Sequence, residues 1–218
     1  MLRVNFASPE LHDFVSASHD DHIKLFFPNG DGEPARRDFT PRRFDTGKGM
    51  LTIDFALHDA GPATQWAASA KPGDMLQIGG PRGSSVVPDD FDWYLLIGDE
   101  TALPAIGRRV EELRAGVPVT TFVIGGAGAG QQFDTHAAWT PHWVTRHADF
   151  DDAELLHAAL ADHSFPDGDG FVWIAAEASV ARHLRGDMVD ERNHPRAWVK
   201  AAGYWKRGIA DAHEKIED

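Results

Sequence analysis

The chain has 218 residues, and 42% of them are hydrophobic, which suffices for the core of one large domain or of two modest ones. Its formal net charge of −13 argues against a general nucleic-acid-binding protein, because neutralising phosphates requires a basic face. The absence of cysteine excludes disulfides, thiolate catalysis, thiolate zinc sites and iron–sulfur clusters, so redox chemistry would need an organic cofactor or a transient metal.

No apolar run approaches the roughly 20 residues that span a bilayer, and residues 1–5 lack the charged-then-apolar plan of a signal peptide. We therefore expect a cytoplasmic protein that contacts neither membrane nor nucleic acid, and we expect it to be a monomer.

The first part of the chain consists of short strand-like runs separated by turn residues. Clear examples are Ile23–Phe27, Leu51–Leu57 and Met75–Ile78, which lie near turn signals rich in Gly and Pro. This rhythm predicts a small antiparallel β-barrel over residues 1–88.

One helix is expected within this barrel domain, over Ala63–Ala70, between Gly61-Pro62 and Lys71-Pro72-Gly73. A helix N-terminus binds anions readily, and Thr64 adds a hydroxyl to the free backbone N–H groups. A plain linker helix fits the same residues equally well.

The segment Arg37-Asp38-Phe39-Thr40 has the residue types of a flavin site. On a strand Arg37 and Phe39 share one face while Thr40 points across the backbone. A guanidinium can bind pyrophosphate oxygens, an aromatic ring can cover an isoalloxazine, and a hydroxyl can bond the ring edge. An edge strand with a solvated arginine is the alternative interpretation.

The pattern changes beyond residue 91, and residues 92–218 predict a second domain of the α/β class. Apolar strands alternate with helical patterns, which indicates a parallel sheet covered on both faces. The strands are expected at Tyr94–Ile97, Val119–Ile124, Trp143–Thr145, Phe171–Ala176 and Ala197–Ala201. The helices are expected at Ala102–Arg114, Ala153–Asp162, Ser179–Glu191 and Trp205–Ile216.

Ligands of such sheets bind at the carboxyl ends of the strands, where the turn Gly98–Pro104 is expected. This turn lacks the Gly-x-Gly-x-x-Gly spacing, and Asp99 and Glu100 would repel a pyrophosphate. The run Gly125–Gly130 is interpreted as a mobile loop, because Gln131 stands where a third fingerprint glycine would be needed.

Ordered motifs across nearly the whole chain resemble the siderophore-interacting protein family, a branch of the ferredoxin-reductase-like flavoproteins. These motifs are Asp21–Pro28, Phe39–Arg43, Asp54–His58, Gly61-Pro62-Ala63 with Trp66-Ala67, Gly80–Ser84, Gly98–Ile106, Trp173–Ser179 and Gly203–Gly208. The resemblance implies an FAD-containing, NADPH- or NADH-dependent ferric-siderophore reductase that releases iron as Fe(II), with reduced ferredoxin as another donor in one variant of the family.

The resemblance also implies roles for single residues. Arg37 would bind the FAD pyrophosphate, Phe39 would stack on the flavin, and Thr40 would bond its ring edge. Asp54 and His58 match the second flavin-contacting strand, and the phosphates or adenine would be surrounded by Ala63, Thr64, Trp66 and Ala67.

In the second domain, Thr101 and Pro104 match the turn that faces flavin and nicotinamide, and Glu177 matches an acidic residue near the nicotinamide. Thr40, Thr101 and Glu177 are the candidates for the reaction itself, while Asp99 and Glu100 are assigned to cofactor binding. Helix capping explains Asp99, Glu100 and Glu177 equally well.

Two departures from the family pattern concern the flavin. The family usually has tyrosine where this chain has Phe39, so stacking is kept while a contact worth about 0.5–1.5 kcal/mol is lost. The chain also begins at Leu2 in what resembles the second barrel strand, so we expect the first strand to be missing and an open edge to need covering.

Further candidates lie near the expected site. A local positive mouth for an anionic ferric siderophore would consist of Arg42, Arg43, Lys48, Lys206 and Arg207, with scattered solubilising charge as the alternative. Tyr204 and Trp205 could border the flavin or belong to the core, and Arg146 could meet a nucleotide phosphate.

Two further classes of function stay open from the sequence. The chain could bind a ferric siderophore without turnover, or it could be a flavin reductase of another acceptor such as a quinone. A built-in metal is not expected, because the pair His19 and His22 lacks the third ligand that a tight site needs.

Overall fold

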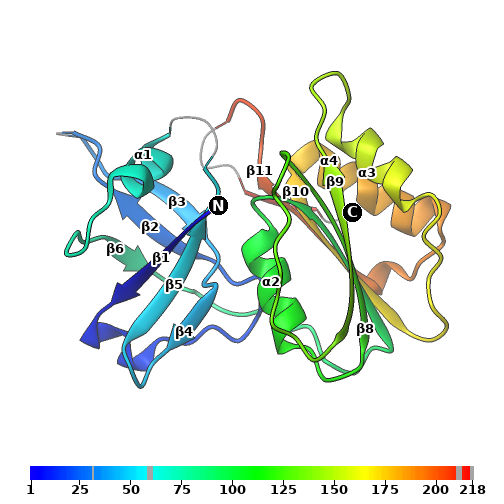
Figure 1. Cartoon of the computed structure of the whole chain (residues 1–218), viewed down its shortest axis with the longest axis horizontal. Coiled ribbons are helices and arrows are strands. Elements are labelled where there is room, and N and C mark those ends of the chain that lie inside the picture. Colours follow the sequence, from blue (N-terminus) through cyan, green and yellow to red (C-terminus); the bar gives the residue numbers. More distant parts are fainter. Residues whose placement is uncertain (31, 58–60, 210–212, 217–218) are drawn as a thin grey trace. The chain divides into compact units, whose positions relative to one another are not determined.

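The computed structural model describes residues 1–30, 32–57, 61–209 and 213–216, and the chain divides into two units, Met1–Val87 and Pro88–Asp218. The predicted fold class is confirmed: an antiparallel β domain is followed by an α/β domain with a parallel sheet (Figure 1). No helix in the described part of the chain is both long enough and apolar enough to span a membrane.

The strands of the first unit pair as two antiparallel sheets, in the orders β1-β5-β4 and β3-β2-β6. Their bounds are β1 Leu2–Ala7, β2 Ile23–Phe27, β3 Ala35–Phe39, β4 Arg43–Asp45, β5 Met50–Phe55 and β6 Gln77–Gly79. A short 3-10 helix, η1 (Pro9–Asp13), follows β1, and helix α1 (Pro62–Ser69) forms where a helix was predicted.

Both sheets of the first unit contribute to one apolar core. Ile23, Leu25 and Phe27 alternate along β2 with half-buried residues, and each is fully buried. From β5, Ile53 and Phe55 join the same cluster. Each buried aliphatic or aromatic side chain stabilises the fold by roughly 1.5–3 kcal/mol, so this period-2 pattern fixes which face of each strand points inward.

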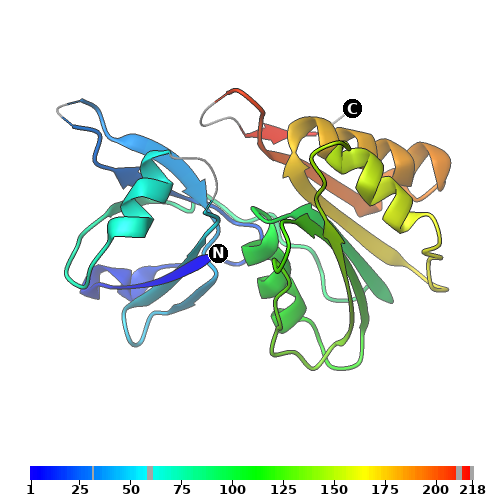
Figure 2. The same cartoon turned by 45° about the horizontal axis from the view of Figure 1, so that its top comes forward.

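The second unit has one sheet in the order β12-β11-β10-β7-β8-β9, parallel except for β12 at its edge. The strands are β7 Trp93–Asp99, β8 Pro118–Gly125, β9 Ala138–Thr145, β10 Gly170–Glu177, β11 Val199–Trp205 and β12 Glu214–Lys215. Helix α2 (Leu103–Glu112) covers one face, while α3 (Asp152–Leu160) and α4 (Ala178–Gly186) cover the other (Figure 2). A π-helical turn, η2 (Asp187–Glu191), extends α4, and a 3-10 turn, η3 (Arg196–Trp198), precedes β11.

The helix predicted over Trp205–Ile216 is wrong in the described residues. Instead, β11 continues to Trp205, and Glu214–Lys215 return as the antiparallel strand β12. A Cβ at Gly203 would come within 2.7 Å of the Ala178 Cβ, so β11 lies directly against the start of α4.

Strand β9 is longer than the predicted Trp143–Thr145. In the described residues it pairs only with β8, and five of its eight residues are exposed. An edge strand tolerates Pro141 and lacks a continuous apolar run, so its first half carries no strong sequence signal.

Candidate functional site

Arg37 and Phe39 lie on one face of β3, as the alternation predicted. Arg37 stands opposite Leu25 and Phe39 opposite Ile23 in the antiparallel register with β2. The Phe39 ring lies 4.6 Å from the Phe55 ring, centroid to centroid, and remains partly exposed. The half-exposed Arg37 guanidinium donates a 2.7 Å hydrogen bond to the Arg36 carbonyl, so an aromatic face and a cation are presented side by side.

Thr40 follows directly after this strand and is only 7% exposed. Among the described residues its hydroxyl has no hydrogen-bonding partner. Its hydroxyl is not among the buried side-chain atoms that lack a partner, so a ligand edge can reach it and exchange a hydrogen bond with it.

The N-terminus of α1 has the features of a phosphate site. Gly61 caps it without a side-chain bond, no acidic residue lies in the first turn, and the first intrahelical bond runs from the Gln65 N–H to the Gly61 carbonyl. The N–H groups of Ala63 and Thr64 therefore lack intrahelical partners and point toward the helix start.

Other residues assigned to the cofactor near α1 have structural roles. Ala67 is 4% exposed and its side chain packs in the apolar core, while its predicted contact with phosphates or adenine stays a prediction. Trp66 packs against Phe27 and Phe55, with ring centroids 5.9 and 6.0 Å away, and is partly buried. His58 lies outside the described residues.

Asp54 is held by arginines inside the first unit. Arg3 donates two hydrogen bonds to its carboxylate, both 2.7 Å, and the Arg42 Nε lies 3.8 Å from Oδ2. Asp54 and Arg42 are 4% and 2% exposed. The structure thus gives Asp54 ionic partners where a cofactor contact was predicted.

The grouping of Arg42 with the surface cations is also wrong, because burial removes it from any exposed positive mouth. Arg43 and Lys48 are exposed, and the Lys48 ammonium lies 2.8 Å from Asp45. Lys206 and Arg207 are exposed in the second unit.

The second unit carries its polar cluster at the topological switch point of the sheet. From β7 the chain proceeds to β8 and β9 on one side, and then returns to β10 and β11 on the other. Asp99, Glu177 and Trp205 stand at the carboxyl ends of β7, β10 and β11. Ligands of open α/β sheets bind at such a reversal of strand order.

Asp99 ties these strand ends together. One carboxylate oxygen accepts bonds from the Thr101 N–H at 2.8 Å and the Thr101 hydroxyl at 2.5 Å. The other accepts from the Trp205 indole at 2.8 Å and the Glu177 N–H at 3.1 Å. Complete burial raises the pKa of Asp99, while the bonds from Thr101 and Trp205 oppose that rise.

Glu177 caps α4, which is the alternative that the sequence left open. Its Oε2 accepts hydrogen bonds from the Ser179 N–H at 2.6 Å, the Ser179 hydroxyl and the Val180 N–H at 3.3 Å. Its Oε1 accepts from the Arg207 N–H at 3.2 Å. Burial opposes ionisation, yet these bonds lower the pKa of Glu177 below its ordinary value, so it is an anionic acceptor at neutral pH.

Arg146 is enclosed by carboxylates. It donates two bonds to Glu100, at 2.6 and 2.8 Å, and three to Asp152, at 2.8 to 3.0 Å. These partners raise the pKa of Arg146 despite its partial burial. The prediction that Arg146 meets a nucleotide phosphate stays a prediction, and in this structure its charge is paired with Glu100 and Asp152. Glu100 is an ion-pair partner and not a helix cap.

The remaining candidates in this unit are aromatic or apolar. Pro104 is buried in the first turn of α2. Tyr204 packs edge-on against Trp173, with ring centroids 6.0 Å apart. The hydrogen bond from Trp205 to Asp99 was not predicted, because Trp205 was assigned to a helix. Its position next to Tyr204 was a signal for a strand, since both aromatic residues favour strands.

Two family models match the chain. The model described as "Siderophore-interacting protein" covers residues 91–208, and that described as "Siderophore-interacting FAD-binding domain" covers residues 1–35 and 28–85.

Among curated proteins, the chain is 34% identical to the NADPH-dependent ferric-chelate reductase of Escherichia coli (strain K12), over 93% of this chain and 86% of that protein. Among solved structures, it resembles a siderophore utilization protein from T. fusca, with 36% identity, a TM-score of 0.86 and coverage of 96% of this chain and 88% of that one. The siderophore-interacting protein SipS from Aeromonas hydrophila matches with 29% identity, a TM-score of 0.82 and coverage of 95% and 86%.

Proposed function

Because the chain belongs to the siderophore-interacting protein family, we propose that it is an FAD-dependent reductase that uses NADPH to reduce the iron of a ferric siderophore. Its first 85 residues match the family's FAD-binding domain, and the curated relative named above is an NADPH-dependent ferric-chelate reductase. We place this activity in the cytoplasm, where NADPH is the common reductant.

The residues of the first unit support a flavin site. Arg37 would hold the pyrophosphate, the exposed part of Phe39 would cover one side of the ring system, and the Thr40 hydroxyl would bond the ring edge. The Ala63 and Thr64 N–H groups would bind further phosphate oxygens. When bound, FAD accepts a hydride from a nicotinamide and can release electrons singly, which a ferric substrate requires.

In the second unit, we assign the nicotinamide site to the carboxyl ends of β7 and β10. Asp99 fixes the backbone of Thr101 and Glu177 there, and it holds the Trp205 indole in one orientation. Thr101 already donates its hydroxyl to Asp99, so its part in the reaction would be to position the turn and not to transfer a proton.

Exposed cations suit the substrate, since ferric siderophores are often anionic. We assign Arg43, Lys206 and Arg207 to its attraction, in a chain whose net charge is −13. Iron is held in siderophores by hard oxygen donors, and reduction to Fe(II) lowers its charge and weakens that binding.

One observation carries the proposal: Phe39 and Arg37 share a face of β3, and Thr40, which is 7% exposed, follows directly after them. The test is the visible spectrum of the purified chain loaded with FAD, before and after anaerobic addition of NADPH, NADH or reduced ferredoxin. We expect a bound-flavin spectrum that NADPH bleaches.

Turnover is measured in the same samples by trapping Fe(II) with a chelator, using a ferric siderophore, a simple ferric chelate and a quinone as acceptors. Siderophore-dependent Fe(II) formation supports the proposal. Siderophore binding without flavin absorbance would identify a binding protein instead, and faster turnover of the quinone would identify another acceptor.

A further inference from the structure

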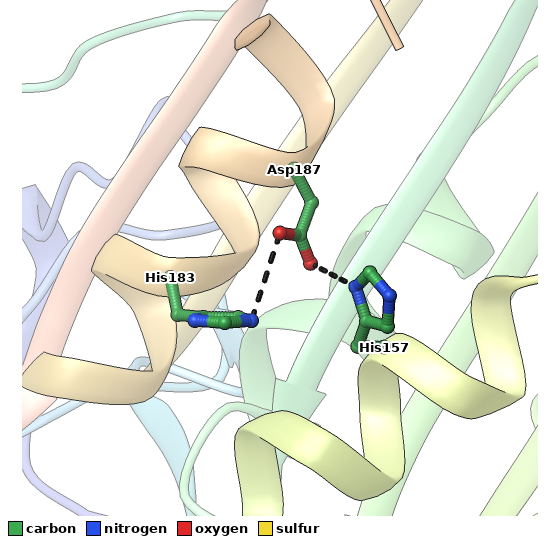
Figure 3. A group of neighbouring side chains, drawn as sticks. All are labelled: His157, His183 and Asp187. Atoms are coloured by element: carbon green, nitrogen blue, oxygen red, sulfur yellow. Dashed lines mark hydrogen bonds and ion pairs between the residues drawn. The ribbon is translucent and has the colours of Figure 1, made fainter. Parts of the chain in front are cut away.

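A group of three metal-ligating side chains lies on the helices of the second unit. His157 comes from α3, His183 from α4 and Asp187 from η2, and their ligand atoms all lie within 4.8 Å of one another. Figure 3 shows the two imidazoles pointing toward the same carboxylate. In the described residues, His19 and His22 belong to no such group, and the three residues of this group were not singled out from the sequence.

The fold fixes the three side chains relative to one another. His183 and Asp187 are four residues apart on a continuous helix, which places them on one face. Helix α3 is held against α4 by Leu156 and Leu184, both fully buried in the same core, so His157 faces this pair across the helix interface. The site is therefore built from packed helices and not from a loop.

The distances suit a small transition metal ion. His157 Nδ1 lies 2.8 Å from Asp187 Oδ2, and His183 Nε2 lies 3.6 Å from Oδ1. Bonds of about 2.0–2.2 Å from zinc to nitrogen or oxygen separate tetrahedral ligand atoms by about 3.3–3.5 Å. Small side-chain rotations are enough to reach that geometry.

The exposure pattern gives an ion both an anchor and an entry path. The Asp187 side chain is 7% exposed at the base of the group, whereas those of His157 and His183 are 49% and 51% exposed. An ion can thus arrive from solvent, and water can complete its coordination.

We propose that His157, His183 and Asp187 form a binding site for a divalent first-row transition metal ion, represented by Zn²⁺. Two imidazole nitrogens and one carboxylate oxygen match the preferences of such ions, while Ca²⁺ and Mg²⁺ require mostly oxygen ligands. The site joins α3 to α4, so a bound ion links these helices directly. The inference is independent of the reductase function.

The test uses the full chain without FAD, freed of metal by a chelator, at pH 8, because the Asp187 carboxylate raises the pKa of His157 and an ion must displace that proton. Zn²⁺ titration is followed by calorimetry and by the midpoint of thermal unfolding. We expect one tight site per chain, a higher midpoint with Zn²⁺, and no response to Mg²⁺ or Ca²⁺.

Variants identify the ligands. His157→Gln and His183→Gln each change a half-exposed side chain and should leave folding intact, which urea unfolding checks. Each should weaken Zn²⁺ binding at least roughly tenfold, since even outer-shell changes at metal sites cost 10- to 100-fold. His136→Gln, at an exposed histidine outside the group, is the matched control and should bind like the parent chain.

Equal Zn²⁺ affinity in the parent chain and in the doubly substituted His157→Gln, His183→Gln variant would overturn the proposal. So would a comparable response to Mg²⁺, because it would indicate diffuse attraction of cations to an acidic surface.

Discussion

The indole nitrogen of Trp205 donates a 2.8 Å hydrogen bond to the buried carboxylate of Asp99, although 106 positions separate the two residues. This bond joins the ends of β11 and β7, two strands that are not neighbours in the sheet, across the end of β10. The polar cluster at the switch point is therefore held together by one carboxylate.

Substitution of Asp99 should destabilise the second unit. In Asp99→Asn one oxygen becomes an amide nitrogen that faces N–H donors, which leaves buried donors unpaired at a cost of about 1–3 kcal/mol. Trp205→Phe removes one donor and should cost about 0.5–1.5 kcal/mol. Both losses are measured as free energies of unfolding in urea. The double variant should lose less stability than the sum of the two single variants, and strict additivity would contradict a direct coupling between Asp99 and Trp205.

Arg37→Ala should weaken FAD binding roughly 10- to 150-fold, since a hydrogen bond to a charged group contributes about 1.5–3 kcal/mol. Arg36→Ala is the matched control: it is the adjacent residue of β3, it points to the opposite face, and it keeps the carbonyl that Arg37 contacts. FAD affinity is measured by flavin fluorescence, and equal losses in the two variants would indicate a general effect of charge.

Arg146→Gln should destabilise the fold and leave nucleotide preference unchanged. Removal of the guanidinium leaves Glu100 and Asp152 without the cation that they share. Because the Arg146 side chain is 32% exposed, we expect the free energy of unfolding to fall by only about 1–2 kcal/mol. The ratio of KM values for NADPH and NADH should change less than about threefold. A selective rise of tenfold or more for NADPH, equivalent to about 1.4 kcal/mol, would show that Arg146 contacts the 2′-phosphate after all.

Gly98→Ala should destabilise the second unit by about 1–3 kcal/mol through overpacking. Its Cβ would come within 2.6 Å of both the Ala102 Cβ and the Ala175 carbonyl oxygen, where strand and helix meet. Gly126→Ala is the control, because a Cβ there has no atom within 4 Å. Thermal unfolding compares the two, and a stable Gly98→Ala variant would mean that α2 can move away from the sheet.

His157→Gln should reduce stability more at pH 6 than at pH 8.5. Asp187 and, more weakly, Glu191 raise the pKa of His157 above 6.5, while Arg192 opposes them. The ion pair of His157 with Asp187 stabilises the fold fully below the pKa of histidine in the unfolded chain, near 6.5. That stabilisation is lost as pH rises through the higher pKa of His157 in the folded chain.

The His157→Gln comparison is made in a metal-free buffer, with His183 retained in both proteins. Burial lowers the pKa of His163 and His194, and these groups act in the opposite direction, but they are common to both chains and cancel in the difference. A difference in stability between the parent chain and His157→Gln that does not depend on pH would contradict the ion pair of His157 with Asp187.

Local pattern was sufficient to predict where most elements form and which strand ends carry polar residues. The alternation along β2 and the apolar run of β7 are properties of neighbouring residues, and Arg37 and Phe39 share a face because any strand would place them so. The strand-to-helix turn Gly98–Pro104 was expected at the carboxyl end of a parallel strand for the same reason, whereas the roles of Thr101 and Glu177 came from the family resemblance.

Partnerships across the sheet were not predictable. Arg3 meets Asp54 across 51 positions and Arg146 meets Glu100 across 46, and both pairs depend on the order of strands. The burial of Arg42 was equally unpredictable, because its Nε lies 3.8 Å from the carboxylate of Asp54 on β5. From the sequence, Asp54, Glu100 and Arg146 were assigned to cofactors and Arg42 to a surface patch, because the ionic partners of these residues carry no local signal.

The bond between Asp99 and Trp205 also has a consequence for biosynthesis. A growing chain produces β7 long before β11, and until the last parallel strand docks, the carboxylate at the end of β7 lacks its indole donor. Contacts of such large sequence separation form late in folding. The Gly98–Pro104 turn therefore gains its full set of contacts only after residue 205 has been synthesised, and a chain released earlier would contain every residue of that turn without the strand that fixes it.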